Sequence, residues 1–319
     1  MVHILFIKTS SLGDVVHFMP AITEVRRHLP DAQITWMVEE DYAPLVRMQQ
    51  GTDAVIPVAV RRWRRRPLGT ETWAEVRSFL QDVRRIRYDA IIDAQGLVRS
   101  ALLARTIRGQ RHGYDFRSAR ESLAAAFYDV RHTVDWNLHA IARNRQLAAQ
   151  ALGYEPDGGP DFGLSREAPT DSRPRYAVLL HGSARPEKVW PEGHWVAVGA
   201  ALEQAGYEVC LPWGSPREKT RSETIAGALG RAHVPPQQPL DGVARLLAGT
   251  ALVVGVDTGL THVAAALGVP LVAVFGGSDP AAHGPQGRGP IAIVGSQGAM
   301  PDAEAVIVAV RKIVERAGG

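Results

Sequence analysis

The stretch V-H-I-L-F-I-K-T-S-S-L-G-D-V-V, residues 2–16, sets the pattern that the chain repeats. A short apolar segment, Val2–Ile7, leads through a turn of small residues into an amphipathic segment, Val15–Leu29. Near-continuous hydrophobicity over a short segment is typical of a parallel strand covered on both faces. Further predicted strands are Ile34–Val38, Ala54–Val60 and Ala90–Asp93, and predicted helices include Thr72–Arg87, Val98–Ile107, Ala119–Tyr128 and Asn137–Leu152.

The alternation stops over Tyr154–Arg175, where prolines and glycines lie among polar residues, and then begins again. Two alternating halves joined by such a segment predict two doubly wound, Rossmann-like α/β domains with parallel sheets that face each other across a cleft. We place the first domain at 1–155, the linker at 156–174 and the second domain at 175–319. The sequence leaves open whether the final helix, Ala303–Glu315, packs on its own domain or on the first.

The composition is that of a soluble globular protein, with 45% apolar and 22% charged residues in 319. Cys210 is the single cysteine, which excludes an internal disulfide and a cysteine zinc cluster. The first apolar run is too short for a signal peptide, and the uncharged run Thr258–Ser278 divides into pieces of helix and strand length. We therefore predict a cytoplasmic protein. The net charge of +3 combines about +5 in residues 1–155 with about −2 in residues 156–319.

Several common nucleotide and metal motifs are missing from the sequence. It contains no G-x-x-x-x-G-K-[ST], no G-x-G-x-x-G after the first strand, no H-E-x-x-H and no D-x-D. We therefore expect no cofactor and no metal ion. A bound diphosphate would then be neutralised by protein cations and helix N-termini.

Asp14 follows the first strand at the start of the first predicted helix. In a doubly wound sheet this turn lies where ligands bind, so the carboxylate could accept a proton from an attacking hydroxyl. Asp is also a common capping residue at a helix N-terminus. Position alone leaves both roles open.

The run R-R-W-R-R-R, residues 61–66, is predicted to be a loop after the third strand. Five arginines around one tryptophan favour an anionic ligand, because guanidinium groups bind carboxylates and phosphates in a bidentate manner. A solvated run of charge is the alternative. Nucleic acid is disfavoured because the rest of the chain is not strongly basic.

Three turns in the second half also follow predicted strands. H-G-S-A-R-P-E-K, residues 181–188, ends in Lys188, which could neutralise a leaving diphosphate or could be an ordinary surface lysine. V-D-T-G-L-T-H, residues 256–262, predicts a helix N-terminus that binds an anion, with simple capping by Asp257 as the alternative. F-G-G-S-D-P, residues 275–280, is the third, and together they favour a nucleotide-diphosphate site.

These segments resemble a known enzyme family. K-T-S-S-L-G-D-V, V-E-E, D-A-Q-G-L-V-R-S, H-G-S-A-R-P-E-K-V-W-P, L-P-W-G-S-P and V-D-T-G-L-T-H are similar to bacterial ADP-heptose:lipopolysaccharide heptosyltransferases nearly from end to end. The R-R-W-R and D-A-Q-G-L-V-R-S stretches most resemble the branch that adds the first heptose of the inner core.

The resemblance implies a GT-B fold in which the second domain binds ADP-heptose, the first binds Kdo-lipid A, and heptose is transferred with inversion and without a metal. It implies catalytic roles for Asp14 as general base and Lys188 on the donor phosphates. The implied donor-binding residues are Ser183, Ala184, Lys188, Glu218, Gln238, Asp257, Thr258, Gly259, Leu260 and His262. The implied acceptor-binding residues are Ser10, Ser11, Gly13, Arg61, Arg62, Arg64 and Arg120. Ala184 replaces a common threonine, and Gln238 replaces an apolar residue expected near the adenine, so donor affinity is left open.

Two other functions remain open at this point. The chain could add a later heptose, and the discriminating observation would be an acceptor that already carries heptose. It could also be a non-catalytic binder of nucleotide sugars or anionic glycans, which would have no need of a base at Asp14. We expect a monomer that binds no nucleic acid, and a lipid-linked acceptor is compatible with a peripheral contact at the inner membrane.

Overall fold

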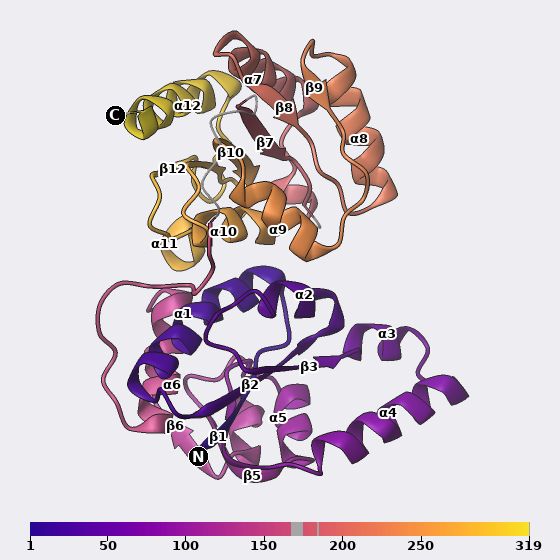
Figure 1. The fold of residues 1–319 in the computed structure, drawn as a ribbon, viewed down its shortest axis with the longest axis vertical. Coiled ribbons are helices and arrows are strands. Elements are labelled where there is room, and N and C mark those ends of the chain that lie inside the picture. The colour runs from indigo at the N-terminus through magenta and orange to yellow at the C-terminus, as the bar shows by residue number, and fades with distance from the viewer. Residues whose placement is uncertain (167–174, 184, 319) are drawn as a thin grey trace. The chain divides into compact units, whose positions relative to one another are not determined.

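A computed structural model describes residues 1–166, 175–183 and 185–318 of the protein. The chain divides into two compact units, Met1–Gly163 and Leu164–Gly319, and each is built around one parallel sheet (Figure 1). The boundary falls inside the predicted linker, whose residues 167–174 lie outside the described residues. None of the described helices is both long enough and apolar enough to cross a bilayer.

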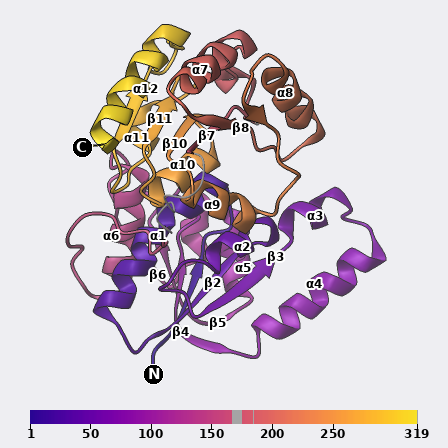
Figure 2. The same ribbon diagram turned by 45° about the horizontal axis from the view of Figure 1, so that its top comes forward.

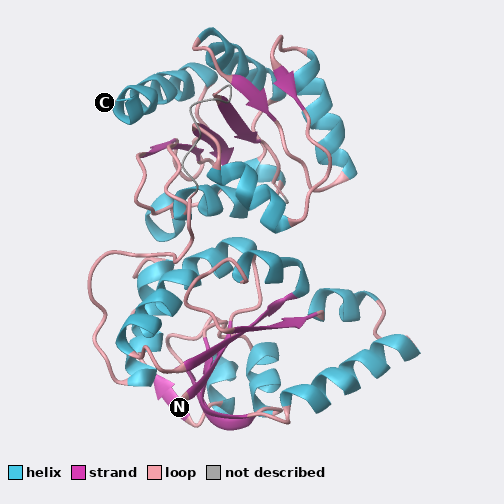
Figure 3. Ribbon diagram, viewed as in Figure 1, coloured by secondary structure: helices cyan, strands magenta, loops and turns pink. Residues whose placement is uncertain are grey.

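The first unit holds a six-stranded sheet in the order β3-β2-β1-β4-β5-β6, with all neighbours parallel. Its strands are β1 (His3–Ile7), β2 (Gln33–Glu39), β3 (Ala54–Val58), β4 (Arg87–Asp93), β5 (Arg108–Tyr114) and β6 (Val130–His132). Its helices are α1 (Leu12–His28), α2 (Ala43–Val46), α3 (Val60–Arg65), α4 (Thr70–Val83), α5 (Val98–Arg105) and α6 (Ala140–Leu152), with 3-10 turns η1 (Glu40–Tyr42) and η2 (Ser122–Phe127). The central strand β1 is apolar and almost fully buried because helices cover both sheet faces (Figure 3).

The second unit repeats the plan with the order β12-β11-β10-β7-β8-β9. Its strands are β7 (Tyr176–Leu180), β8 (Glu208–Cys210), β9 (Ala232–His233), β10 (Leu252–Val256), β11 (Leu271–Val274) and β12 (Ile291–Val294). Its helices are η3 (Pro186–Lys188), α7 (Glu192–Gln204), α8 (Pro216–Gly227), α9 (Leu240–Ala248), α10 (Gly259–Ala266), α11 (Pro280–His283) and α12 (Ala303–Gly318). Helix α12 buries Val306, Val310 and Ile313 in this unit's core, so the final helix packs on its own unit.

Both strand orders follow the doubly wound plan, so the predicted pair of Rossmann-like domains is confirmed. In such a sheet, the strand order reverses between two central strands, and ligands bind beyond the carboxyl ends of that pair. The pair is β1 and β4 in the first unit and β7 and β10 in the second. The turns after these four strands are therefore where a site is expected.

The structure corrects two local predictions. Residues 61–66 are not a loop, because most of them form helix α3. The predicted helix Ala119–Tyr128 contains only the 3-10 turn η2. The structure also contains strands β5, β6 and β9, which the sequence does not predict. The sequence of β5, R-G-Q-R-H-G-Y, is polar, and β5 lies toward the edge of the sheet, where burial is incomplete.

Candidate functional site

In the first unit, Gln95 connects the turns after β1 and β4. Its Oε1 atom accepts hydrogen bonds from the backbone N–H groups of Thr9 (3.0 Å) and Ser10 (3.1 Å). The buried Asp93 carboxylate in turn accepts from the Gln95 N–H at 2.9 Å and from the Tyr128 hydroxyl at 2.8 Å. These contacts fix the backbone of the turn that leads to α1.

Asp14 lies in the first turn of α1, with its side chain partly open to solvent. Its Oδ2 atom accepts hydrogen bonds from the Ser11 N–H at 2.7 Å and the Ser11 hydroxyl at 3.1 Å, and the first of these is one half of a capping box between Ser11 and Asp14. Arg120 Nη1 lies 4.0 Å from the same oxygen. The structure thus brings three of the predicted residues together, and it shows that Asp14 caps the helix. Capping leaves room for a chemical role because a carboxylate offers two oxygens.

The electrostatics around Asp14 keep it ionised. Burial would raise the pKa of its carboxyl, but the Lys8 ammonium, the Ser11 hydrogen bonds and the Arg120 guanidinium outweigh burial and hold the pKa below the ordinary 3.8. Lys8 is buried, and its Nζ donates to the Ala94 carbonyl at 2.8 Å. Burial also lowers the pKa of Lys8, against the opposing attraction of Asp14 and Asp93. Asp14 is therefore a carboxylate throughout the neutral range, the protonation state that a general base requires.

The predicted acceptor arginines of α3 differ in what they contact. Arg62 binds Glu40 (2.9 Å) and Glu75 (2.6 Å), so its guanidinium is committed to two carboxylates of its own unit. The Arg61 guanidinium lies 4.9 Å from the centre of the Tyr42 ring. Arg64 is exposed. The role of these arginines in binding an acceptor stays a prediction, and Arg62 would have to exchange partners to take part.

In the second unit, the turns after β7, β10 and β11 converge on one charged group. Lys188 forms a buried ion pair with Asp257, whose Oδ2 also accepts a hydrogen bond from the Ser278 hydroxyl. His262 Nε2 lies 3.5 Å from Asp257 Oδ1. We call these four residues the Lys188 cluster. A Cβ at position 277 would lie 2.8 Å from Lys188 Cγ, so the lysine stem passes directly over Gly277.

The Asp257 carboxylate is strongly stabilised in its ionised form. Burial would raise its pKa, but the hydrogen bonds from His262, Lys188 and Ser278 and the charge of Lys188 lower it far below its usual range. Lys188 and Asp257 therefore form an ion pair beyond the carboxyl ends of β7 and β10, where the strand order of this sheet reverses. An anion that binds here could draw the lysine ammonium away while Ser278 and His262 keep the carboxylate in place.

Helix α10 starts beside this cluster. Thr258 is its N-cap, and the first two N–H groups, those of Gly259 and Leu260, have no acceptor within the helix, whereas the Thr261 N–H donates to the Thr258 carbonyl at 3.0 Å. Thr261 turns its hydroxyl away from them and donates to the Val256 carbonyl at 2.6 Å. The aligned N–H groups and the helix dipole favour a negatively charged group at this end.

Glu218 lies at the start of α8, close to the turn after β7. It accepts hydrogen bonds from the Gly214 N–H (2.8 Å) and the Ser215 N–H (3.1 Å), which caps the helix. A Cβ at position 182 would lie 2.6 Å from its Oε1 atom, so a larger residue there would displace the Glu218 carboxylate. Ser183 accepts from the Arg185 N–H at 3.2 Å. Ala184 lies outside the described residues.

Gln238 is half-buried in the loop that precedes α9. This loop is tied to the segment before α8, since the Trp213 indole donates to the Pro235 carbonyl at 2.9 Å and Gln237 donates to the Gly214 carbonyl at 3.0 Å. The predicted donor residues Glu218 and Gln238 therefore belong to two loops that are fastened together.

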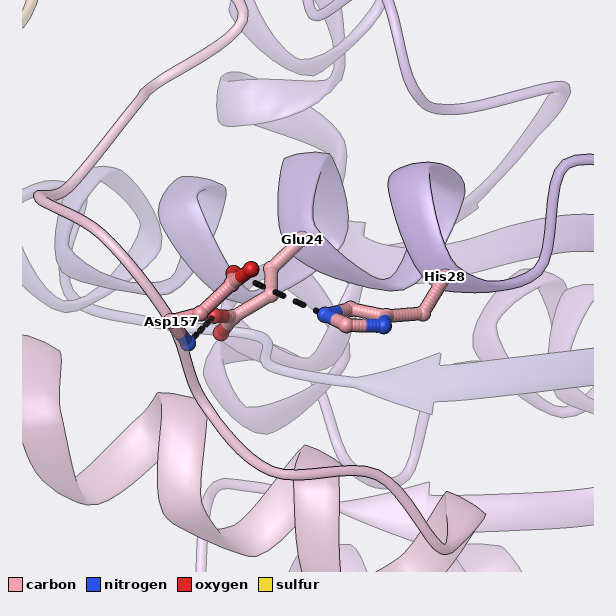
Figure 4. Close-up of side chains that lie close together, drawn as sticks. All are labelled: Glu24, His28 and Asp157. Carbon is pink, nitrogen blue, oxygen red and sulfur yellow. Dashed lines mark hydrogen bonds and ion pairs between the residues drawn. The ribbon is translucent and has the colours of Figure 1, made fainter.

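One group in the described part of the chain brings three metal-ligand side chains close together, namely Glu24, His28 and Asp157 (Figure 4). Its acidic oxygens already have partners. Glu24 accepts from Arg145 Nε (3.0 Å) and Nη2 (2.7 Å) and from the Asp157 N–H (2.8 Å), and Arg27 pairs with Asp157. The group therefore fastens the end of the first unit to α1, at the opposite end of that helix from Asp14.

Three residues with a clear place in these networks were not identified from the sequence as site residues. Gln95 fixes the turn before Asp14, Lys8 is the charged group that most lowers the pKa of Asp14, and Ser278 donates a hydrogen bond to Asp257. Each lies in a stretch that the sequence did single out: K-T-S-S-L-G-D, D-A-Q-G-L-V-R-S and F-G-G-S-D-P. Their individual roles depend on which turns the strand order brings together, which the sequence pattern does not specify.

Comparison with known proteins identifies the family. The profile of glycosyltransferase family 9 (heptosyltransferase) matches residues 76–309. Lipopolysaccharide heptosyltransferase 1 of Escherichia coli K12 is 41% identical over 291 residues, which cover 89% of this chain and 91% of that protein. The protein of the same name from Pseudomonas aeruginosa PAO1 is 44% identical over 289 residues, or 89% of this chain and 81% of that protein.

Solved structures of the E. coli heptosyltransferase WaaC share the fold. The complex with ADP superposes with a TM-score of 0.90 at 38% identity, covering 99% of this chain and 100% of that one. The complex with ADP-2-deoxy-2-fluoro heptose gives 0.86 at 37% identity and covers 99% of each chain. The predicted GT-B fold is confirmed by these matches.

Proposed function

Because this chain belongs to glycosyltransferase family 9, the heptosyltransferases, we propose that it moves a heptosyl group from ADP-heptose to the Kdo sugar of Kdo-lipid A, with inversion and without a metal ion. The observation that carries the acceptor choice is the 41–44% identity to two proteins named lipopolysaccharide heptosyltransferase 1. The product would be the first heptose of the lipopolysaccharide inner core.

The second unit would bind ADP-heptose at the switch point of its sheet. Support comes from the Lys188 cluster and from the N-terminus of α10, which lie at the carboxyl ends of β7 and β10. The diphosphate would accept hydrogen bonds from the N–H groups of Gly259 and Leu260 and attract the Lys188 ammonium away from Asp257. Glu218 and Gln238, on two loops tied together, would contact the adenosine.

The first unit would activate the acceptor. The attacking Kdo hydroxyl gives its proton to the free oxygen of Asp14 as its own oxygen bonds to the anomeric carbon of the heptose. The bond from that carbon to the phosphate oxygen breaks on the opposite face, and its electron pair leaves with ADP. A positioned base contributes roughly 10²–10⁴-fold to such a step. Lys188 and the α10 N–H groups would stabilise the charge that develops on the departing diphosphate.

The protein's own cations would take the place of a metal in this mechanism. Lys188 and the amide groups of α10 are suited to binding a diphosphate. The carboxylates of the Glu24, His28 and Asp157 group already pair with Arg145 and Arg27, and this group lies at the opposite end of α1 from Asp14. We therefore expect heptose transfer to proceed without a divalent cation.

A direct experiment separates this function from the addition of a later heptose. The enzyme, treated with chelator, is incubated with ADP-heptose and either Kdo-lipid A or an acceptor that already carries one heptose, and the products are weighed by mass spectrometry. We expect the gain of one heptose on the heptose-free acceptor. A gain only on the heptose-bearing acceptor would show a later-acting transferase, and binding of ADP-heptose without any product would show a non-catalytic binder.

A further inference from the structure

Helices α3 and α4 and the turn between them project from the side of the first unit that ends in the edge strand β3 (Figures 1 and 2). The turn, Arg66–Gly69, exposes a large apolar side chain, because Leu68 is 91% open to solvent. Trp73, in the first turn of α4, is 64% open. Two large apolar side chains are therefore exposed within six residues of each other, at the part of this arm where α3 ends and α4 begins.

The pattern of α4 shows that Trp73 continues an apolar stripe beyond the core. Phe79 packs against the core of the first unit and Val83 is buried in it, whereas Val76 is half-buried. Trp73 precedes Val76 by three residues, a spacing that places both on one side of a helix. The stripe thus extends one turn past the residues that the unit covers. Single exposed apolar residues are ordinary on proteins, but here Leu68 lies only five residues before Trp73, the exposed end of the stripe.

The same arm carries net positive charge. Residues 60–83 contain six arginines and three acidic residues, a charge of about +3, which equals the net charge of the whole chain, so the remainder is close to neutral. Of the three acidic residues, Glu75 is paired with Arg62, and Asp82 lies 3.4 Å from Arg85. Arg65 and Arg66, next to Leu68, are exposed. Positive charge and apolar surface are concentrated in the same few residues.

We propose that this arm docks on an anionic lipid bilayer, with Leu68 and Trp73 entering the interfacial region and Arg65 and Arg66 contacting the headgroups. Arginine beside leucine and tryptophan is typical of interfacial membrane anchors, because the apolar side chains enter the acyl boundary while the arginines remain among the headgroups. The rest of the chain has no excess of positive charge to support broad contact with a polyanion such as nucleic acid, whereas a bilayer needs only this local patch. Docking would bring the enzyme to the lipid-linked acceptor, so its biological purpose rests on the proposed function.

The test measures lipid binding without any acceptor. The purified protein is floated with vesicles of phosphatidylethanolamine and phosphatidylglycerol, and with vesicles of phosphatidylcholine alone, at low and physiological salt. We expect binding to the anionic vesicles that weakens as salt increases. Leu68→Ser and Trp73→Ser should each weaken binding roughly 10-fold, and Arg65→Gln with Arg66→Gln roughly 25-fold.

The matched control is Leu123→Ser, since Leu123 is also a highly exposed leucine (70%) of the first unit. Its vesicle binding should equal that of the wild type. Leu68→Ser, Trp73→Ser and Leu123→Ser should each transfer heptose normally to a soluble, delipidated acceptor, which separates docking from catalysis. Equal binding of Leu68→Ser, Trp73→Ser and wild-type protein to anionic vesicles would overturn the proposal, as would no binding by the wild type. Self-association that Leu68→Ser abolishes, with no vesicle binding, would assign the surface to a second copy instead.

Discussion

Replacing Asp14 by Asn separates its chemical role from its role as a helix cap. The carboxamide oxygen of Asn can still accept the hydrogen bond that the Ser11 N–H donates at 2.7 Å, so α1 keeps its N-terminal geometry. What disappears is the negative charge and the second carboxylate oxygen. The change isolates proton transfer more cleanly than an alanine would.

The expected effects differ greatly in size. Loss of a charge at a helix N-terminus costs about 0.3–1 kcal/mol of unfolding free energy, and loss of the attraction to the Lys8 ammonium adds to this. Loss of a general base lowers turnover roughly 10²–10⁴-fold. The Asp14→Asn protein should therefore fold and bind ADP nearly as the wild type does while its turnover collapses.

The measurements are transfer to Kdo-lipid A, calorimetry with ADP and denaturant unfolding. Asp302→Asn is the matched control, because Asp302 accepts a hydrogen bond from the Ala305 N–H at the start of α12 (2.8 Å) and is outside both proposed binding sites. It should lose some stability and no activity. Turnover of Asp14→Asn within about tenfold of the wild type would refute the assignment of Asp14 as base.

The pKa of Asp14 also predicts the pH dependence. Its pKa in the folded protein lies below 3.8, so the stabilisation from its ionised form is present above that value and is lost only as the pH falls through the lower, folded value. Turnover should therefore show no loss from Asp14 protonation between about pH 5 and pH 8. An acid limb in this range that disappears in Asp14→Asn would contradict the electrostatic account.

Three further substitutions probe the second unit. Lys188→Ala should weaken ADP-heptose binding in calorimetry and lower turnover roughly 10²–10³-fold; unchanged kinetics would make Lys188 a structural partner of Asp257 alone. Ser278→Ala should raise the KM for ADP-heptose severalfold with a smaller change in kcat. Ser278→Thr keeps the hydroxyl and should have a KM close to that of the wild type. An equal rise in KM in both variants would indicate that Ser278 acts through packing. Gly182→Ala places a Cβ 2.6 Å from the Glu218 carboxylate and should weaken ADP binding. The control Gly193→Ala, whose Cβ meets no atom within 4 Å, should bind ADP as the wild type does. Equal ADP affinities of the two variants would show that Glu218 is not part of the nucleotide site.

Much of the fold could be predicted from the sequence because its central strands are apolar and its turns carry glycine, serine and proline. β1, β7 and β10 fall almost where the hydrophobic runs lie. β5 could not be found in this way, because near the sheet edge a polar strand is stabilised by backbone pairing with its neighbours. The R-R-W-R-R segment is stabilised as a helix because Arg62 and Trp63 donate hydrogen bonds to the Glu75 carboxylate on α4. The hydrophobic pattern of the segment itself does not reveal this contact between two helices.

The sequence identified many residues of the candidate site, but it did not show which of them contact one another. The sequence placed Asp14, Lys188 and Asp257 at strand ends, and the strand order brings Lys188 to Asp257. The sequence did not show that Lys188 and Asp257 form an ion pair. That pairing depends on β7 and β10 being neighbours although more than 70 residues separate them along the chain.

Protein groups alone should carry out a single displacement at the anomeric carbon of the heptose. Nuclear magnetic resonance of the purified product, made by chelator-treated enzyme from ADP-heptose and Kdo-lipid A, tests this. We predict one new heptosyl linkage, with anomeric configuration opposite to that of the donor, formed at the same rate with and without added divalent cation. Retained configuration, or product only when a divalent cation is added, would contradict it.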